Sequence, residues 1–149
     1  MDKNKLVKLL SDTFSLHEFR KKRNDWIKET AELVKLINLQ QSRFGNLFYL
    51  NYGFIIKSLE TQNLRMHIFY GFGSTDDIVN DRIKQLLDFE TNISDQDREK
   101  ELTPLLENLI IAGLEGVNSE SDILQELNTR SHLNDVPLLV KEHFGIADV

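Results

Sequence analysis

Apolar residues follow a period of two through much of the first half of the chain. The clearest alternation lies between about residues 47 and 57, where one parity holds Phe48, Leu50, Tyr52, Phe54 and Ile56. Successive side chains of a strand point to opposite faces, so this pattern predicts a strand with one continuous apolar face. Less regular patterns predict strands at about 19–29, 31–41 and 65–72. Four successive strands with short links predict an antiparallel meander.

Helical spacing dominates elsewhere. Residues 2–13 are predicted to form an N-terminal helix, and most of the segment from about 76 to 144 is predicted to be helical. Pro104 interrupts that second region: either the helix kinks there, or a new helix begins with Thr103 as its cap. The fold class is therefore α+β. We expect a single domain over residues 1–149, with a four-stranded sheet at about 19–72 and helices packed on one face.

Composition and net charge exclude several functions but do not identify one. The chain has 149 residues, no cysteine and a formal net charge of −6. Cysteine-based nucleophiles, disulfides and zinc sites are excluded. A nonspecific nucleic-acid binder is normally basic, so we expect no nucleic-acid partner. The start of the sequence carries charges every few residues and no stretch is apolar enough for a bilayer, so we expect a cytoplasmic protein without a membrane partner.

One local run departs from the acidic balance. Four successive cations occupy positions 20–23, Arg-Lys-Lys-Arg. Such a run could attract phosphate groups, or it could be a solvated strand edge whose charges prevent edge-to-edge pairing. We favour the second interpretation.

The opposite parity of the predicted strands gathers polar side chains. The candidate binding residues are Asn38, Gln40, Asn51, Arg65 and His67. Together they could line a pocket on one sheet face, with His67 available as acid or base because its ordinary pKa lies near neutral. Alternatively, the amides satisfy strand edges and turns and His67 is solvated. No nucleophile or carboxylate accompanies the group, so we assign no catalytic residue. The histidine spacings predict no metal site, and no cofactor motif is present.

These motifs resemble a known family. The block LVKLINLQQSRFGNLFYLNYGF, the His67-Ile68 pair and the later segment 86–90 (LLDFE) resemble a bacterial family designated domain of unknown function 4304. The resemblance extends over nearly the whole chain and implies an α+β fold, but it implies no activity. Where the family pattern has an arginine after His67-Ile68, this chain has Phe69 and Tyr70, so a family site that used that arginine is not expected here.

Two functions fit these observations. The first is a non-enzymatic, immunity-like or regulatory binding module that docks a protein partner, and the net charge favours a partner with a basic surface. The second is a small-molecule-binding or hydrolytic domain that uses the polar sheet face. A buried His67 in a closed pocket would favour the second function.

Overall fold

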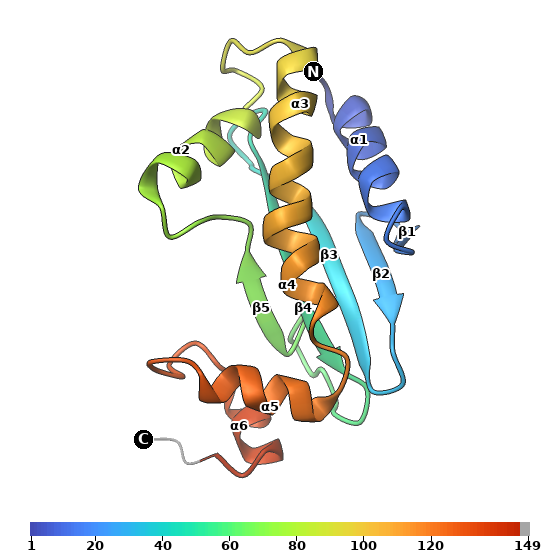
Figure 1. Ribbon diagram of the computed structural model, residues 1–149, viewed down its shortest axis with the longest axis vertical. Helices are drawn as coiled ribbons and strands as arrows, with labels where there is room; N and C mark the ends of the chain where they lie inside the picture. Colours follow the sequence, from blue (N-terminus) through green and yellow to red (C-terminus); the bar gives the residue numbers. More distant parts are fainter. Residues whose placement is uncertain (147–149) are drawn as a thin grey trace.

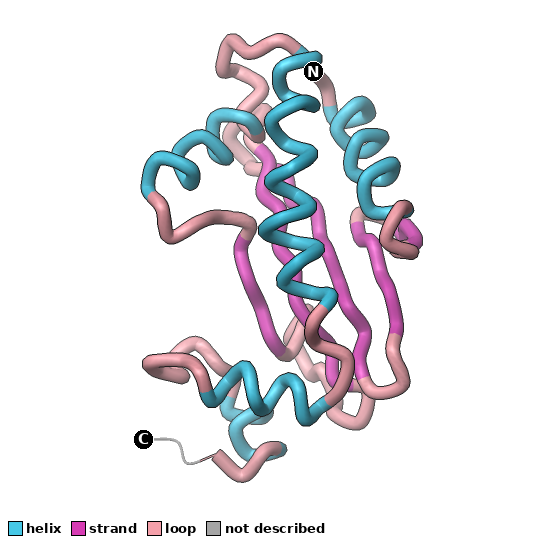
Figure 2. Tube along the Cα trace, in the orientation of Figure 1, coloured by secondary structure: helices cyan, strands magenta, loops and turns pink. Residues whose placement is uncertain are grey.

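The computed structural model describes residues 1–146, and its centre is a five-stranded antiparallel sheet (Figure 1). Each strand pairs only with its neighbours in sequence, so the chain runs as a meander (Figure 2). The α+β class and the antiparallel arrangement are confirmed, with five strands in place of the expected four. The strands are β1 (Arg20–Lys22), β2 (Asp25–Glu29), β3 (Leu33–Gln41), β4 (Phe48–Ile56) and β5 (Ile68–Gly71).

The additional strand comes from the segment 19–29, which we predicted to be a single strand. It folds back on itself, and Lys22 pairs with Asp25 across a two-residue turn. Arg23 occupies the first turn position with φ of 58°. A positive φ at that position matches the right-handed twist of a hairpin, but it is normally signalled by glycine. An arginine there gave no sequence signal for a turn.

The helices cover one face of this sheet, as expected (Figure 1). They are α1 (Lys3–Ser15), α2 (Asp77–Leu86), α3 (Asp95–Leu105), η1 (Leu106–Ile111), α4 (Ala112–Glu115), α5 (Glu120–Asn128) and α6 (Leu138–His143). α1 and the long α3–α4 helix lie over the strands, α2 flanks one end of the sheet, and α5 and α6 lie at the other. Side-chain caps from Asp2, Asp76, Ser94 and Ser119 begin four of these helices.

The helix at Pro104 neither ends nor restarts. Pro104 lies inside α3, which continues directly into the π-helical turn η1 and then into α4. Four buried residues spaced exactly four apart line its core-facing side: Leu102, Leu106, Ile110 and Leu114. In a regular α-helix, each step of four residues overshoots a full turn by about 40°. The wider π turn offsets this drift and keeps the stripe on the sheet.

The core lies between the sheet and these helices. Phe54 is only 1% exposed, as its parity predicted. Tyr52 is half-buried; it lies beside Gly113 of α4 and its ring stacks on Tyr70, with centroids 5.3 Å apart. From the sequence, we expected Phe54 and Tyr52 to be largely buried against helical leucines such as Leu105 and Leu109. Both leucines are only partly buried, because the core-facing stripe of the helix lies one position further along.

Candidate functional site

The sheet face opposite the helices, here called the open face, carries the polar positions predicted from parity. The strand register places Asp25, Asn38 and Asn51 side by side on β2, β3 and β4. The Asn38 amide donates to the Asp25 carboxylate at 2.7 Å, and the Arg65 guanidinium donates to the same oxygen, also at 2.7 Å. Asp25 therefore joins two of the predicted residues. Sequence reasoning missed it, although it is the sole acid between Arg20 and Lys28.

The remaining amides complete this group. The Asn51 side chain donates to Gln40 at 3.2 Å. Asn38, Gln40, Asn51 and Arg65 line one hollow of about 510 Å³, with Phe69 at its border. The structure thus brings four of the five predicted residues together. Their polar atoms mostly satisfy one another, so they form a preorganised polar surface.

His67 does not belong to this surface, which corrects the parity prediction. Its side chain is 1% exposed. Nδ1 accepts a hydrogen bond from the Ile56 N–H at 2.8 Å, and Nε2 lies 2.8 Å from the Glu60 carbonyl. A bend at His67 precedes β5, so the alternation of faces that we extrapolated to Arg65 begins only at Ile68. Both ring nitrogens bind backbone, and His67 is unavailable as an acid or base.

A second part of the open face is apolar and basic. A hollow of about 550 Å³ adjoins the amide group; its apolar lining is Ile27, Val34, Leu36 and Ile55, and its charged lining is Arg20, Lys22, Arg23, Asp25, Glu29 and Arg65. The hollow is thus lined by four cationic and two anionic side chains. Arg20 pairs with Glu29 at 3.3 Å, whereas within residues 1–146 Lys22 and Arg23 form no ion pair. All of β1 is exposed at the sheet edge, which fits the predicted role of the basic run.

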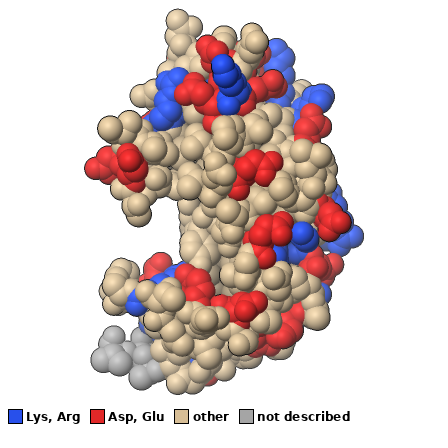
Figure 3. Space-filling model, viewed as in Figure 1, with Lys and Arg blue, Asp and Glu red and all other residues tan. Residues whose placement is uncertain are grey.

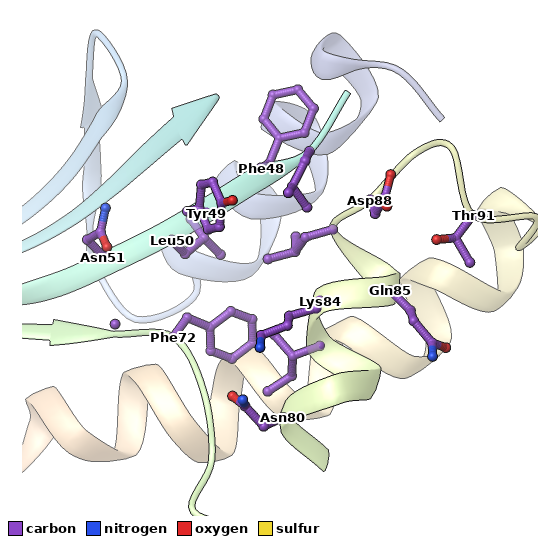
Figure 4. A pocket seen from close by; sticks show the side chains of 14 residues that line it. Phe48, Tyr49, Leu50, Asn51, Phe72, Asn80, Lys84, Gln85, Asp88 and Thr91 are labelled. Carbon is purple, nitrogen blue, oxygen red and sulfur yellow. The ribbon is translucent and has the colours of Figure 1, made fainter. Parts of the chain in front are cut away.

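A separate pocket lies at the border of the sheet, between β4 and α2 (Figure 4). Its volume is about 460 Å³, within the usual range for small-molecule sites. Apolar side chains make most of its wall, and Lys84 extends from α2 toward Phe72 inside it. We call it the α2 pocket. Its lining residues include Leu47, Phe72, Ile83, Lys84, Leu87 and Asp88.

Two polar side chains on the helix-covered face were not among the predicted site residues. Lys35 is 1% exposed and its ammonium donates to Asn118 at 2.8 Å. Burial lowers the pKa of Lys35, and nearby Glu115 acts in the opposite direction. Tyr70 accepts a hydrogen bond from Arg130 at 2.9 Å, and burial raises its pKa to about 12. Neither residue lines the open face or the α2 pocket, so we treat both as structural.

The part of the chain that the structure describes contains neither a metal-binding cluster nor a membrane-spanning helix. Among residues 1–146, no cluster of three or more histidine or acidic side chains could hold a metal ion. In the same part of the chain, no helix combines the length and apolar character needed to cross a membrane.

Fold and surface together define a small α+β protein with a meander sheet, helices on one face and a preorganised polar group on the other. Residues 13–115 match the family described as domain of unknown function (DUF4304), and the chain belongs to that family. The match spans the whole sheet and the long helix that covers it. No curated protein and no solved structure matches the chain.

Proposed function

We propose that this protein is a non-enzymatic binding module of the bacterial cytosol, and that its open face docks an acidic surface of a protein partner. The observation that carries the proposal is the combination of partly exposed apolar side chains and excess positive charge on one uncovered sheet face. Phe69 is 55% exposed there. An apolar centre with a charged rim is the usual anatomy of a protein–protein interface.

The charge of the open face sets the chemistry of the partner. Net charge alone favoured a basic partner, but the balance on this face is opposite in sign. Lys22 and Arg23, which form no ion pair within residues 1–146, lie at its border, where they would attract carboxylates during approach and at the rim of the complex. A basic partner would have to dock on another surface, such as the helix-covered face, where acidic side chains are exposed (Figure 3).

The observation that suggested a hydrolytic domain on the same face does not hold. It depended on a reactive His67, and both nitrogens of that ring bind backbone. The small-molecule alternative moves from the amide group to the α2 pocket, whose walls are mostly apolar and which shares no lining residue with the basic hollow.

The test begins with partner capture from the native host by cross-linking, followed by binding of the identified protein to purified variants. Reversing the unpaired cations, with Lys22→Glu and Arg23→Glu together, should weaken binding by tenfold or more and should remove much of its salt dependence. Lys3→Glu and Lys100→Glu place the same charge change on α1 and α3 and serve as the matched control.

Cross-links and amide shifts should map to the open face. The proposal is wrong if the captured partner contacts the helices, if it binds the reversed variant as tightly as the wild type, or if cross-linking in the host yields no specific partner.

A further inference from the structure

The hydrogen-bonded edge of β4 has a gap where it borders the α2 pocket. On one side of the gap, the Phe72 N–H donates to the Leu50 carbonyl at 2.8 Å. On the other side, the Phe48 N–H donates to the Leu87 carbonyl at 2.9 Å. β5 ends at Gly71, so the edge between these two contacts faces the pocket.

Two backbone groups of β4 point into this gap. The N–H and C=O of one strand residue lie on the same edge. The Leu50 N–H therefore points where its carbonyl does, and the Phe48 C=O points where its N–H does. Among residues 1–146, neither group has a hydrogen-bond partner. Both residues are 2% exposed, and unpaired backbone groups at such positions are rare in folded proteins.

These groups select the ligand by geometry. One donor and one acceptor on a strand edge match the C=O and N–H of a single added residue, which also point to one side, as in strand addition. A bound residue would continue the ladder that Phe72 and Leu87 leave open. The apolar side chains around the gap, including Ile83 and Leu87, favour an aliphatic side chain on that residue.

Charge narrows the class further. The Lys84 ammonium reaches into the pocket from α2 and pairs with no carboxylate among the described residues (Figure 4). Asp88 is the pocket's acid, and its carboxylate accepts the Glu90 N–H at 3.0 Å, which ties it to the backbone turn after α2. Figure 4 shows Asp88 and Lys84 on different sides of the pocket. Lys84 therefore supplies a positive charge on the side of the pocket away from Asp88.

We propose that the α2 pocket binds a small apolar carboxylate that carries one amide, such as an N-acylated aliphatic amino acid or the C-terminal residue of a peptide. The amide N–H donates to the Phe48 C=O, and the carboxylate accepts from the Leu50 N–H and pairs with Lys84. The aliphatic group contacts Ile83 and Leu87. This site is independent of protein docking on the open face, and either can fail without the other.

Three probes separate the parts of this assignment. N-acetyl-L-leucine has the amide, the aliphatic group and the carboxylate. N-acetyl-L-leucinamide lacks the charge, and 4-methylpentanoate lacks the amide. Each is titrated into the isotope-labelled full chain while backbone amide resonances are followed. N-acetyl-L-leucine should bind with a dissociation constant in the millimolar range or tighter, and the Leu50 amide proton should move downfield as it gains a hydrogen bond. Each incomplete probe should bind about tenfold more weakly.

Two variants test the pocket residues. Lys84→Met should reduce the affinity for N-acetyl-L-leucine about tenfold and leave the affinity for the neutral leucinamide unchanged. Lys100→Met, on α3 outside this pocket, is the matched control. Gly71→Leu adds a side chain to the lining, where a β-carbon would meet no atom within 4 Å, and should block all three probes.

Thermal melts establish that each variant is folded. The proposal is overturned if N-acetyl-L-leucine produces no saturable shift at Leu50, if the neutral probe binds as tightly as the acid, or if Lys84→Met and Lys100→Met behave alike.

Discussion

The ring of His67 is fixed between two backbone groups, with the Ile56 N–H donating to Nδ1 at 2.8 Å. On its other side, Nε2 lies 2.8 Å from the Glu60 carbonyl, which can only accept. The ring is therefore the neutral tautomer with its proton on Nε2. It joins the end of β4 to the loop that precedes β5, so its role is architectural.

Replacing His67 with alanine should lower the free energy of unfolding by about 2–4 kcal/mol, because the buried Ile56 N–H loses its acceptor and a cavity remains. Urea melts measure the loss. His132, which is exposed, provides the control, and His132→Ala should change stability by less than about 0.5 kcal/mol. If both substitutions lowered the free energy of unfolding equally, His67 would not have the architectural role assigned to it.

Gly53 should not tolerate any side chain. A β-carbon there would lie 1.8 Å from the Ile68 carbonyl oxygen and 2.8 Å from the Met66 sulfur. Gly53→Ala should therefore cost about 3 kcal/mol or more, since the two strands must separate locally. Gly116→Ala meets nothing within 4 Å and is the control. A melt of Gly53→Ala that matches wild type would mean that β5 shifts at little cost.

Phe54 should contribute heavily to the core. Its side chain is 1% exposed between the sheet and the helices, so Phe54→Ala should cost about 3–5 kcal/mol. The comparison is Phe44→Ala, because Phe44 is 95% exposed and its removal should leave stability nearly unchanged. A loss below about 1 kcal/mol for Phe54→Ala in denaturant melts would reverse the assignment of sheet faces.

Asn51 lies on the open face, and its bond to Gln40 is accessible to water. Asn51→Ala should therefore cost less than about 1 kcal/mol. If Asn51 belongs to the docking surface, the same substitution should weaken binding of the captured partner. A loss of stability above about 2 kcal/mol would make the amide a structural group and would remove it from the candidate binding residues.

The Tyr70 hydroxyl should lose its proton at a higher pH than an exposed tyrosine. Its pKa is raised to about 12, chiefly by burial and then by the negative charge of Glu126, whereas a tyrosine in the unfolded chain titrates near 10. Between these values the unfolded chain has released the proton and the folded chain retains it. Stability should therefore fall as pH rises from about 10 to 12. Absorbance titration of tyrosinate, compared with Tyr70→Phe, measures the shift; titration of Tyr70 near 10 would contradict it.

Much of the sheet was predictable because burial imposes a period of two. The parity of Phe48, Leu50 and Phe54 correctly assigned the helix-facing side of β4, and Asn38, Gln40 and Asn51 share the open face as their parity required. β3 and β4 pair with each other over their whole length. Regular pairing preserves the alternation, so pattern and structure agree there.

The errors came from positions where backbone conformation departs from its usual sequence signals. Arg23 adopts a positive φ without being glycine or asparagine, so a hairpin was read as one strand. The bend before Ile68 places Met66 over Gly53 and sends His67 toward Ile56, which parity could not foresee. The α2 pocket was missed for a different reason: Leu50 and Lys84 are distant in sequence and meet only in the fold.

The π turn in the long helix has a consequence for how this chain can vary. η1 lies between Leu102 of α3 and Leu114 of α4, and it keeps both side chains on the same side of the continuous helix. Deleting one residue from Leu106–Ile111 would let regular α geometry return, and the remaining steps of about 100° each between Leu102 and Leu114 would make three turns and about 20°. Leu114 would then stay on the core side, and Gly113 would stay near Tyr52. An inserted residue would instead add about 100° and turn Leu114 away from the core unless the helix bulged further. This helix should therefore tolerate the loss of one residue at η1 better than the gain of one.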